Sequence, residues 1–279
     1  MKIYENLSFD EERALYGEKN IYIKDCSFDG PADGESALKE AGEITADRCI
    51  FNLRYPLWHC DGVKIYNCEM TENCRAALWY SNDIEVVGGK YDGIKALREC
   101  NRAFLSQIKV NSPEFGWFSS DITAHDSEFV SEYFMLRAKR LNFSNINFKG
   151  KYSFQYVEDS VFENCNFDTK DAFWHARNVT VRNSTVKGEY LAWYCENVTF
   201  ENCTIIGTQP LCYCKNLKLV NCKMIDCDLS FEKSSVDAVI QGHIDSVKNP
   251  ESGRILADSI GEIIDENRTC EIKTANKIY

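Results

Sequence analysis

Apolar and polar residues alternate in short phrases that recur along most of the chain. The stretch "NVTFENCTI" begins at Asn197, and similar stretches begin at Asn178 and Asn216, at equal intervals before and after it. In each phrase two apolar residues, two positions apart, are followed by a polar corner and a second apolar pair. This alternation predicts two short β-strands joined by a bend. A fixed period of roughly 20 residues is typical of a solenoid.

The first apolar residue of each phrase defines a register position. From Ile84 onward these positions are equally spaced, and two of the three earlier intervals are slightly longer. A third strand is expected before each register position, as in "PLCYCKN". Three strands per turn predict an all-β fold, a single-stranded right-handed parallel β-helix of about twelve coils with a period of about 19 residues. The register positions are Ile21, Ile44, Val63, Ile84, Ala103, Ile122, Leu141, Ser160, Val179, Val198, Leu217 and Val236.

Two segments break the repeat. The stretch "DGPADGESALKEAG" lengthens the first turn, and the pattern changes again after His243. We therefore expect a β-helix over residues 1–247, with an N-terminal insertion at 29–43, and a C-terminal cap over 248–279. A cap is expected because the open end of a solenoid exposes unpaired strand edges.

The repeat also accounts for most of the 14 cysteines. Many occupy the position five residues after the register position, where a small side chain pointing inward suits a narrow coil; Gln241 falls in the same position and is expected to point inward too. In-register parallel neighbours aim their Cβ atoms alike, so we expect free thiols. The N-terminus shows no signal-peptide pattern. Reduced thiols and this start predict a cytoplasmic protein.

Charge and missing motifs narrow the function classes. The net charge of −11 disfavours nucleic acid or an anionic membrane as the partner. No apolar segment reaches the roughly 20 residues needed to span a bilayer. We find no pair of CxxC motifs for a metal site, and no phosphate loop, dinucleotide fingerprint or Ser-His-Asp arrangement. The sequence predicts neither a metal nor a cofactor.

The third strand carries an aromatic row that we expect to face outward. The residue six positions before each register position is apolar and should point inward, so the next residue should point outward. This outward row holds all five tryptophans: Lys39, Trp58, Trp79, Arg98, Trp117, Leu136, Gln155, Trp174, Trp193 and Cys212. The residues that follow it form a second row: Glu40, His59, Tyr80, Glu99, Phe118, Arg137, Tyr156, His175, Tyr194 and Tyr213.

The two outward rows together form an aromatic stripe. Leaving a tryptophan side chain in water costs roughly 1.5–3 kcal/mol relative to burying it, so the stripe needs an explanation. Three interpretations remain open: a ligand groove, an interface between copies of the chain in a homo-oligomer, and a ladder that stacks on itself. Flat rings suit sugar faces, and the charged neighbours suit hydroxyl or carboxylate groups. The groove interpretation predicts an oligosaccharide or another small polyhydroxylated ligand.

Charged residues converge on the middle of the stripe. Glu99 and Glu114 lie on neighbouring coils, about 5 Å apart along the solenoid, and could meet the separation of about 5–9.5 Å used in glycoside hydrolysis. The candidate catalytic residues are Glu99, Glu114 and Arg98, with Glu99 as the first choice of acid/base. In a lyase, Lys95 or Arg98 would be the base. A salt-bridged surface without chemistry is the other interpretation.

The candidate substrate contacts lie on both sides of this cluster. We expect a ligand to lie lengthwise over Trp79, Arg98, Trp117 and Tyr156. The full set is Trp58, His59, Trp79, Tyr80, Lys95, Trp117, Tyr133, Arg137, Tyr156, Asp171, Trp174, His175 and Trp193.

The "VTFENC"-type phrases, the "GPADGESALKEAG" insertion and the "GRILADSIGEIIDE" ending resemble those of a bacterial family of β-helix proteins of unknown function. That family is grouped with the pectate-lyase-like superfamily, and its members are often labelled hydrolases. The resemblance implies the fold and polysaccharide chemistry, and it supplies no catalytic residue. The NTD, DD, GHG and RIK motifs of polygalacturonase-like hydrolases and the WiDH and RxPxxR motifs of pectate lyases are missing. The predicted function is an oligosaccharide hydrolase or lyase, with a non-catalytic carbohydrate-binding or assembly scaffold as the alternative.

Overall fold

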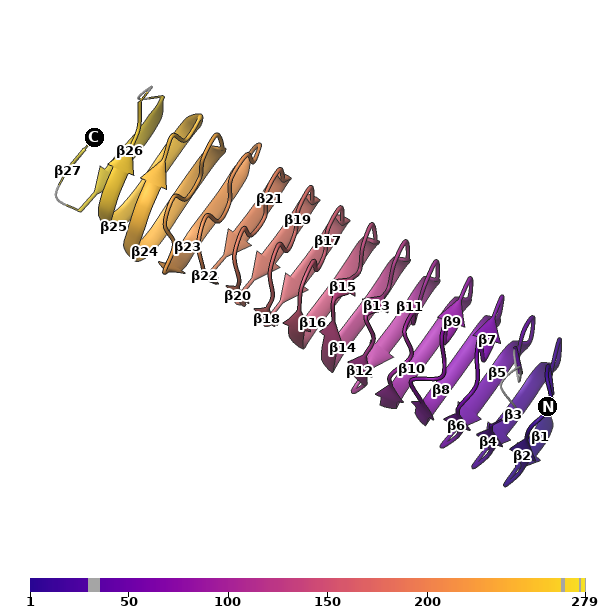
Figure 1. Cartoon of the computed structure of the whole chain (residues 1–279). Coiled ribbons are helices and arrows are strands. Elements are labelled where there is room, and N and C mark those ends of the chain that lie inside the picture. Colours follow the sequence, from indigo (N-terminus) through magenta and orange to yellow (C-terminus); the bar gives the residue numbers. More distant parts are fainter. Residues whose placement is uncertain (30–35, 267–268, 276, 279) are drawn as a thin grey trace. The chain divides into compact units, whose positions relative to one another are not determined.

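The chain is a parallel β-solenoid of about 14 turns with a period near 19 residues. The computed structural model describes residues 1–29, 36–266, 269–275 and 277–278, and these contain strands and turns without a helix (Figure 1). The predicted register is confirmed; Val179, for example, pairs with Val198. More turns form than the expected twelve because strands also pair ahead of Ile21 and beyond Val236. Residue contacts divide the chain into two units, Met1–Asn142 and Phe143–Tyr279.

In the N-terminal unit each turn begins with a strand that contains the register position. These strands are β1 (Lys2–Glu5), β3 (Lys19–Lys24), β5 (Gly42–Asp47), β8 (Asp61–Met70), β10 (Asn82–Tyr91), β11 (Asn101–Ser106) and β14 (Ser120–Ser131). After the bend come β2 (Ser8–Phe9), β4 (Ser27–Phe28), β6 (Ile50–Phe51) and β12 (Lys109–Asn111). The segment that precedes the next register position forms the third side of each turn. It carries β7 (Leu57–Trp58), β9 (Leu78–Trp79), β13 (Glu114–Phe115) and β15 (Tyr133–Phe134). Much of the expected insertion, residues 30–35, lies outside the described residues.

The C-terminal unit repeats the arrangement, and β16 (Lys139–Gly150) begins just before it. Its first strands are β17 (Glu158–Glu163), β19 (Arg177–Arg182), β21 (Glu196–Glu201), β23 (Leu217–Ile225), β24 (Ser235–Lys248), β25 (Ser252–Ile264) and β26 (Cys270–Thr274). Its second strands are β18 (Asn166–Asp168), β20 (Thr185–Lys187) and β22 (Thr204–Ile206). Parallel pairing continues through β25 and β26, and β27 (Lys277–Ile278) pairs antiparallel with β26.

The core follows from the inward rows of the repeat. Phe9, Phe28 and Phe51 stack at centroid distances of 4.8 and 4.9 Å, one ring per turn. All 14 cysteines are buried free thiols, as expected. Most of their thiols bond to backbone carbonyls of the preceding turn; Cys203 Sγ, for instance, lies 3.3 Å from the Val181 carbonyl oxygen. Such bonds let a weakly polar side chain fill a coil that is too narrow for larger ones.

The third side of each turn differs from the expected strand. It consists mainly of turns because left-handed residues interrupt the extended backbone, as at Phe173 (φ 60°) and His175 (φ 57°). Its N–H groups still bond between turns: Phe173 N donates to the Ser153 carbonyl at 2.9 Å. The third side is therefore hydrogen-bonded between turns as a strand would be, and its left-handed residues form corners at the same places in successive turns.

The regular register shifts at β24. Ile240 pairs with Cys222, and its side chain is buried. Gln241, which we expected to point inward, is exposed instead. The cause is a pair of β-bulges: β23 has one extra residue relative to β24, and β24 has one extra residue relative to β25. A bulge moves the following side chains to the opposite face.

Candidate functional site

The outward aromatic rows are set by the backbone of the third side. The residue after each tryptophan is left-handed, with φ values of 55° at His59, 52° at Tyr80 and 57° at Phe118. This conformation costs an L-residue about 1–2 kcal/mol. Stacking of aromatic rings contributes about 0.5–1.5 kcal/mol per pair, which offsets much of that cost.

In the N-terminal unit the tryptophan row is a continuous stack of rings and cations. Trp58 and Trp79 stack at 5.8 Å, and Lys39 Nζ lies 4.9 Å from the Trp58 ring centroid. Arg98 sits between Trp79 and Trp117, at 5.4 and 5.0 Å from their ring centroids. The five tryptophans are half-buried, which agrees with an outward row. Because neighbours cover the faces of Trp58 and Trp79, a ligand meets ring edges there.

Arg98 is also the centre of the predicted charge cluster. Its Nε lies 3.6 Å from Glu99 Oε1 and its Nη1 lies 3.4 Å from Glu114 Oε2. Lys95 Nζ is 3.8 Å from the same Glu114 oxygen. Because both carboxylates contact one guanidinium group, their nearest oxygens lie no more than about 9 Å apart, which is compatible with the separation of about 5–9.5 Å that glycoside hydrolysis uses. The structure therefore brings the three candidate catalytic residues together.

Three N–H donors in this row are buried without a hydrogen-bond partner among the described residues: Trp58 Nε1, Trp79 Nε1 and Arg98 Nε. The next tryptophan is satisfied, since Trp117 Nε1 donates to the Tyr133 carbonyl at 2.8 Å. An unpaired buried donor costs about 1–3 kcal/mol. The region around Trp79 and Arg98 is thus the part of the row that has most to gain from a hydrogen-bond acceptor.

The second row extends the site on its solvent side. His59 and Tyr80 stack at 5.0 Å, and the ladder is interrupted at Glu99, one turn further on. Phe118 and Tyr133 are exposed and contact Trp117 edge-on, at 6.3 and 6.0 Å. Arg137 is exposed in the same row. The N-terminal unit therefore presents charged groups flanked by aromatic edges.

The C-terminal unit carries the remaining candidates without a comparable charge cluster among its described residues. Tyr156, His175, Tyr194 and Tyr213 stack in sequence at 4.7, 5.0 and 4.9 Å. Trp174 and Trp193 stack at 5.4 Å, and their Nε1 atoms donate to the carbonyls of Tyr190 and Gln209. These residues form a second aromatic surface, and the N-terminal cluster is a site of its own.

Two expectations for the C-terminal unit need correction. Cys212, placed in the outward row, is buried, and its thiol lies 3.6 Å from the Gln209 and Pro210 carbonyl oxygens. Asp171, proposed as a substrate contact, is largely buried too, and that burial raises the pKa of its carboxyl group. Neither side chain is freely presented to a ligand.

Sequence reasoning missed a Ser-His-Asp grouping at the bulge. His243 Nδ1 lies 2.8 Å from Ser259 Oγ, and His243 Nε2 lies 3.7 Å from Asp245 Oδ1. The pairing of His243 with Ser259 is shorter in sequence than the regular period, so the repeat gave no signal for it. Within the part of the chain that the structure covers, no three His, Cys, Asp or Glu side chains converge as a metal site would need. Nor does any helix there have the length and hydropathy of a membrane span.

The chain belongs to the family described as "Protein of unknown function (DUF3737)", whose model matches residues 2–278. No curated protein matches it. Among solved structures it is similar to PfbA, a surface adhesin of Streptococcus pneumoniae, with 9% identity and a TM-score of 0.41, over 100% of this chain and 78% of that one.

Two further similar structures have comparable scores. The tailspike of Pseudomonas phage phi297 has 12% identity and a TM-score of 0.36, over 87% of this chain and 48% of that one. The A-module of the Azotobacter vinelandii mannuronan C-5 epimerase AlgE4 has 8% identity and a TM-score of 0.31, over 97% of this chain and 86% of that one. Identities this low say nothing about the site residues.

Proposed function

For this member of the family, we propose an oligosaccharide-active protein whose site is the Arg98 cluster of the N-terminal unit. The observation that carries the proposal is the placement of one guanidinium group between two indole rings and two carboxylates. Aromatic edges offer apolar contact for the C–H groups of a sugar ring. Carboxylate and guanidinium groups offer acceptors and donors for its hydroxyl groups.

The reaction that this arrangement supports best is hydrolysis of a glycosidic bond. One carboxyl group, Glu99 in our assignment, donates its proton to the leaving oxygen as the bond to the anomeric carbon breaks. Glu114 removes a proton from a water molecule as the water oxygen forms the new bond to that carbon. Arg98 bridges the two carboxylates and holds their orientation. Lys95, whose Nζ lies 3.8 Å from Glu114 Oε2, helps to hold that carboxylate in place.

A second candidate is binding without turnover. The C-terminal unit presents the Tyr156–Tyr213 ladder, which supplies ring edges and hydroxyl groups but has no pair of carboxylates bridged by an arginine among the described residues. Such a surface would suit a carbohydrate-binding or assembly scaffold. A cytoplasmic location belongs to the same proposal, because 14 free thiols favour a reducing compartment.

The test uses a panel of neutral and acidic oligosaccharides, with binding measured by calorimetry and cleavage by the appearance of new reducing ends. Glu99→Gln should abolish turnover and keep binding, because an amide preserves shape and cannot donate the proton. Trp117→Ala should weaken binding by about 1–3 kcal/mol. Glu128→Gln is the matched control, since Glu128 is exposed and pairs with Lys109 away from the cluster.

Full activity of Glu99→Gln on a verified substrate would overturn the catalytic assignment. If the wild-type protein binds sugars and cleaves none, the binding scaffold is the correct function. If no oligosaccharide binds, the proposal as a whole is wrong.

A further inference from the structure

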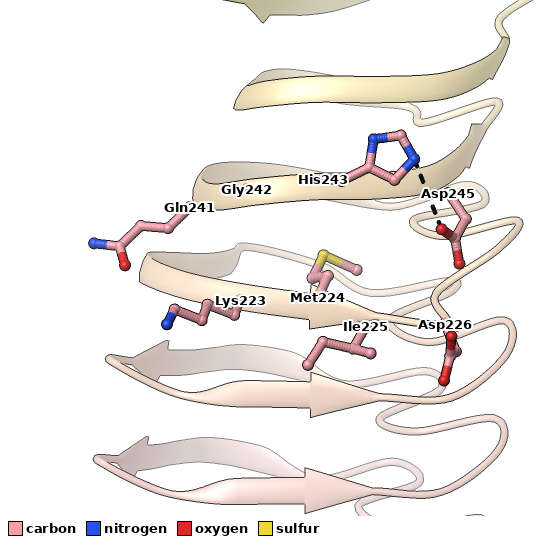
Figure 2. Close-up of a pocket in the computed structure, with 8 residues that line it drawn as sticks. All are labelled: Lys223, Met224, Ile225, Asp226, Gln241, Gly242, His243 and Asp245. Atoms are coloured by element: carbon pink, nitrogen blue, oxygen red, sulfur yellow. Dashed lines mark ion pairs between the residues drawn. The ribbon is translucent and has the colours of Figure 1, made fainter.

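A pocket of about 440 Å³ lies in the C-terminal unit between β23 and β24 (Figure 2). It forms where β24 carries its extra residue, between Ile240 and His243. Gly242, at that bulge, has φ 92° and open space where a Cβ atom would lie. A bulge that interrupts regular stacking and re-aims side chains is a common way to build a binding site. This pocket does not include any residue of the Arg98 cluster.

The pocket has chemically opposite ends. Figure 2 shows Lys223 and Gln241 at one end and Asp226 and Asp245 at the other. Lys223 lies on β23 and Asp226 directly follows the end of that strand, so the two charged ends are at most roughly 10 Å apart along the chain. Ile225 lies between them and is 46% exposed. The apolar middle and charged ends suit a short linear ligand.

One charged group at each end lacks an ion-pair partner. Among the described residues, neither Lys223 nor Asp226 forms an ion pair, whereas Lys187 pairs with Asp168 elsewhere in this unit. The acids at the other end lie close to one thiol: burial raises the pKa of Cys227 to about 12, and the charges of Asp245 and Asp226 contribute to that rise. Asp226 and Asp245 are therefore both close to Cys227, at the same end of the pocket.

His243 completes the acidic end. Its Nδ1 lies 2.8 Å from Ser259 Oγ, which fixes the ring so that Nε2 faces Asp245 at 3.7 Å. Gly242 N donates to Asp258 Oδ2 at 2.7 Å, which holds the bulge in place. The walls of the pocket are thus positioned by contacts with β25, and Lys223 and Asp226 remain available to a ligand.

We propose that this pocket binds a small linear zwitterion, such as an ω-amino acid. The ammonium group lies between Asp226 and Asp245, the carboxylate accepts from Lys223 and the Gln241 amide, and the methylene chain covers Ile225. Charge-assisted hydrogen bonds at both ends give the preference for a ligand that carries both charges. The binding is independent of the oligosaccharide site.

The probe is 6-aminohexanoate, titrated into the full chain labelled with ¹³C at isoleucine methyl groups. We expect the Ile225 methyl signal to shift, with a dissociation constant on the order of 1–10 mM. Hexylamine and hexanoate, which each lack one charge, should bind about tenfold more weakly. Asp226→Asn should weaken binding of 6-aminohexanoate and hexylamine alike, and Lys223→Met should weaken only the ligands that carry a carboxylate.

Two control variants lie outside the pocket. Lys218→Met removes an exposed lysine of the same strand, and Asp159→Asn changes an aspartate with the same left-handed backbone (φ 52°) as Asp226 (φ 53°). Both should leave binding unchanged. The proposal is wrong if 6-aminohexanoate does not shift Ile225, if the one-ended probes bind equally well, or if Asp226→Asn binds like the wild type. Unchanged far-ultraviolet circular dichroism of each variant shows that it is folded.

Discussion

Replacing Arg98 with methionine removes the guanidinium charge that contacts both carboxylates of the candidate site, and it keeps an unbranched side chain. In the structure this guanidinium group contacts two indole rings, at 5.4 and 5.0 Å, and two carboxylates, at 3.6 and 3.4 Å. Its side chain is 19% exposed, so these contacts are only partly screened. We expect Arg98→Met to lower the free energy of unfolding.

The magnitude follows from the individual contacts. Two cation–π contacts contribute about 0.5–1 kcal/mol each at a partly exposed position. The two ion pairs contribute about 0.5 kcal/mol each. Removing the buried Nε, which has the 3.6 Å contact with Glu99 but no hydrogen bond, returns about 1 kcal/mol, and methionine keeps part of the apolar contact with the rings. The net loss is about 1–2 kcal/mol.

The assay is urea unfolding followed by both circular dichroism and tryptophan fluorescence. Arg98→Met should unfold at lower urea, and its native emission should move to longer wavelength because methionine covers the faces of Trp79 and Trp117 less completely than the guanidinium group does. The matched control is Arg102→Met, which removes a bidentate pair with Asp83 on the exposed surface, so its effect should be smaller. If Arg98→Met shifts the midpoint no more than Arg102→Met, the stacked cluster does not stabilise the unit and our reasoning is wrong.

Three further outcomes are expected. Thiol titration of the denatured protein should find 14 reactive groups, and titration of the native protein at pH 8 should find almost none, because all the thiols are buried and burial raises the pKa of Cys100, for example, to about 12. Several missing thiols in the denatured protein would contradict this. Asp171→Asn should be more stable than the wild type at neutral pH and should lose that advantage below about pH 4. The reason is that a carboxyl group with a raised folded-state pKa lowers the free energy of unfolding as pH rises through that pKa. Equal pH profiles of the two proteins in urea unfolding would count against this. Gly207→Ala should be strongly destabilising in the same assay, since its Cβ would overlap with the Gly188 carbonyl oxygen. Gly17→Ala should cost far less, because there is open space around that position. Similar urea midpoints for the two variants would refute the packing argument.

The sequence predicted the fold because the period and the inward rows repeat over most of the chain. Leu97, Met135, Phe154 and Phe173 are buried as expected, because an apolar residue recurs at the same place in each turn even though the backbone there is left-handed and not extended. The prediction failed at Gln241, where a bulge changes the face of the strand. A single extra residue leaves no mark in the apolar pattern that distinguishes it from ordinary variation.

The sequence predicted which residues form the candidate site, but it did not predict the contacts between their side chains. Register alone placed Arg98, Glu99 and Glu114 on neighbouring turns. It could not show that Arg98 would lie over the rings of Trp79 and Trp117, because ring orientation depends on side-chain torsions and on the left-handed corner that follows each tryptophan. The Ser259–His243 contact lies outside the regular period, so the repeat could not predict it.

The five indole N–H groups offer the most direct test of the proposed oligosaccharide site. The protein is labelled with ¹⁵N at tryptophan, each signal is assigned by substitution, and an oligosaccharide that binds by calorimetry is added. We predict that the signals of Trp79 and Trp117 shift, most strongly for Trp79, whose Nε1 is buried without a partner among the described residues, and that those of Trp174 and Trp193 stay in place. Shifts confined to Trp174 and Trp193, or none at all, would contradict a site at Arg98.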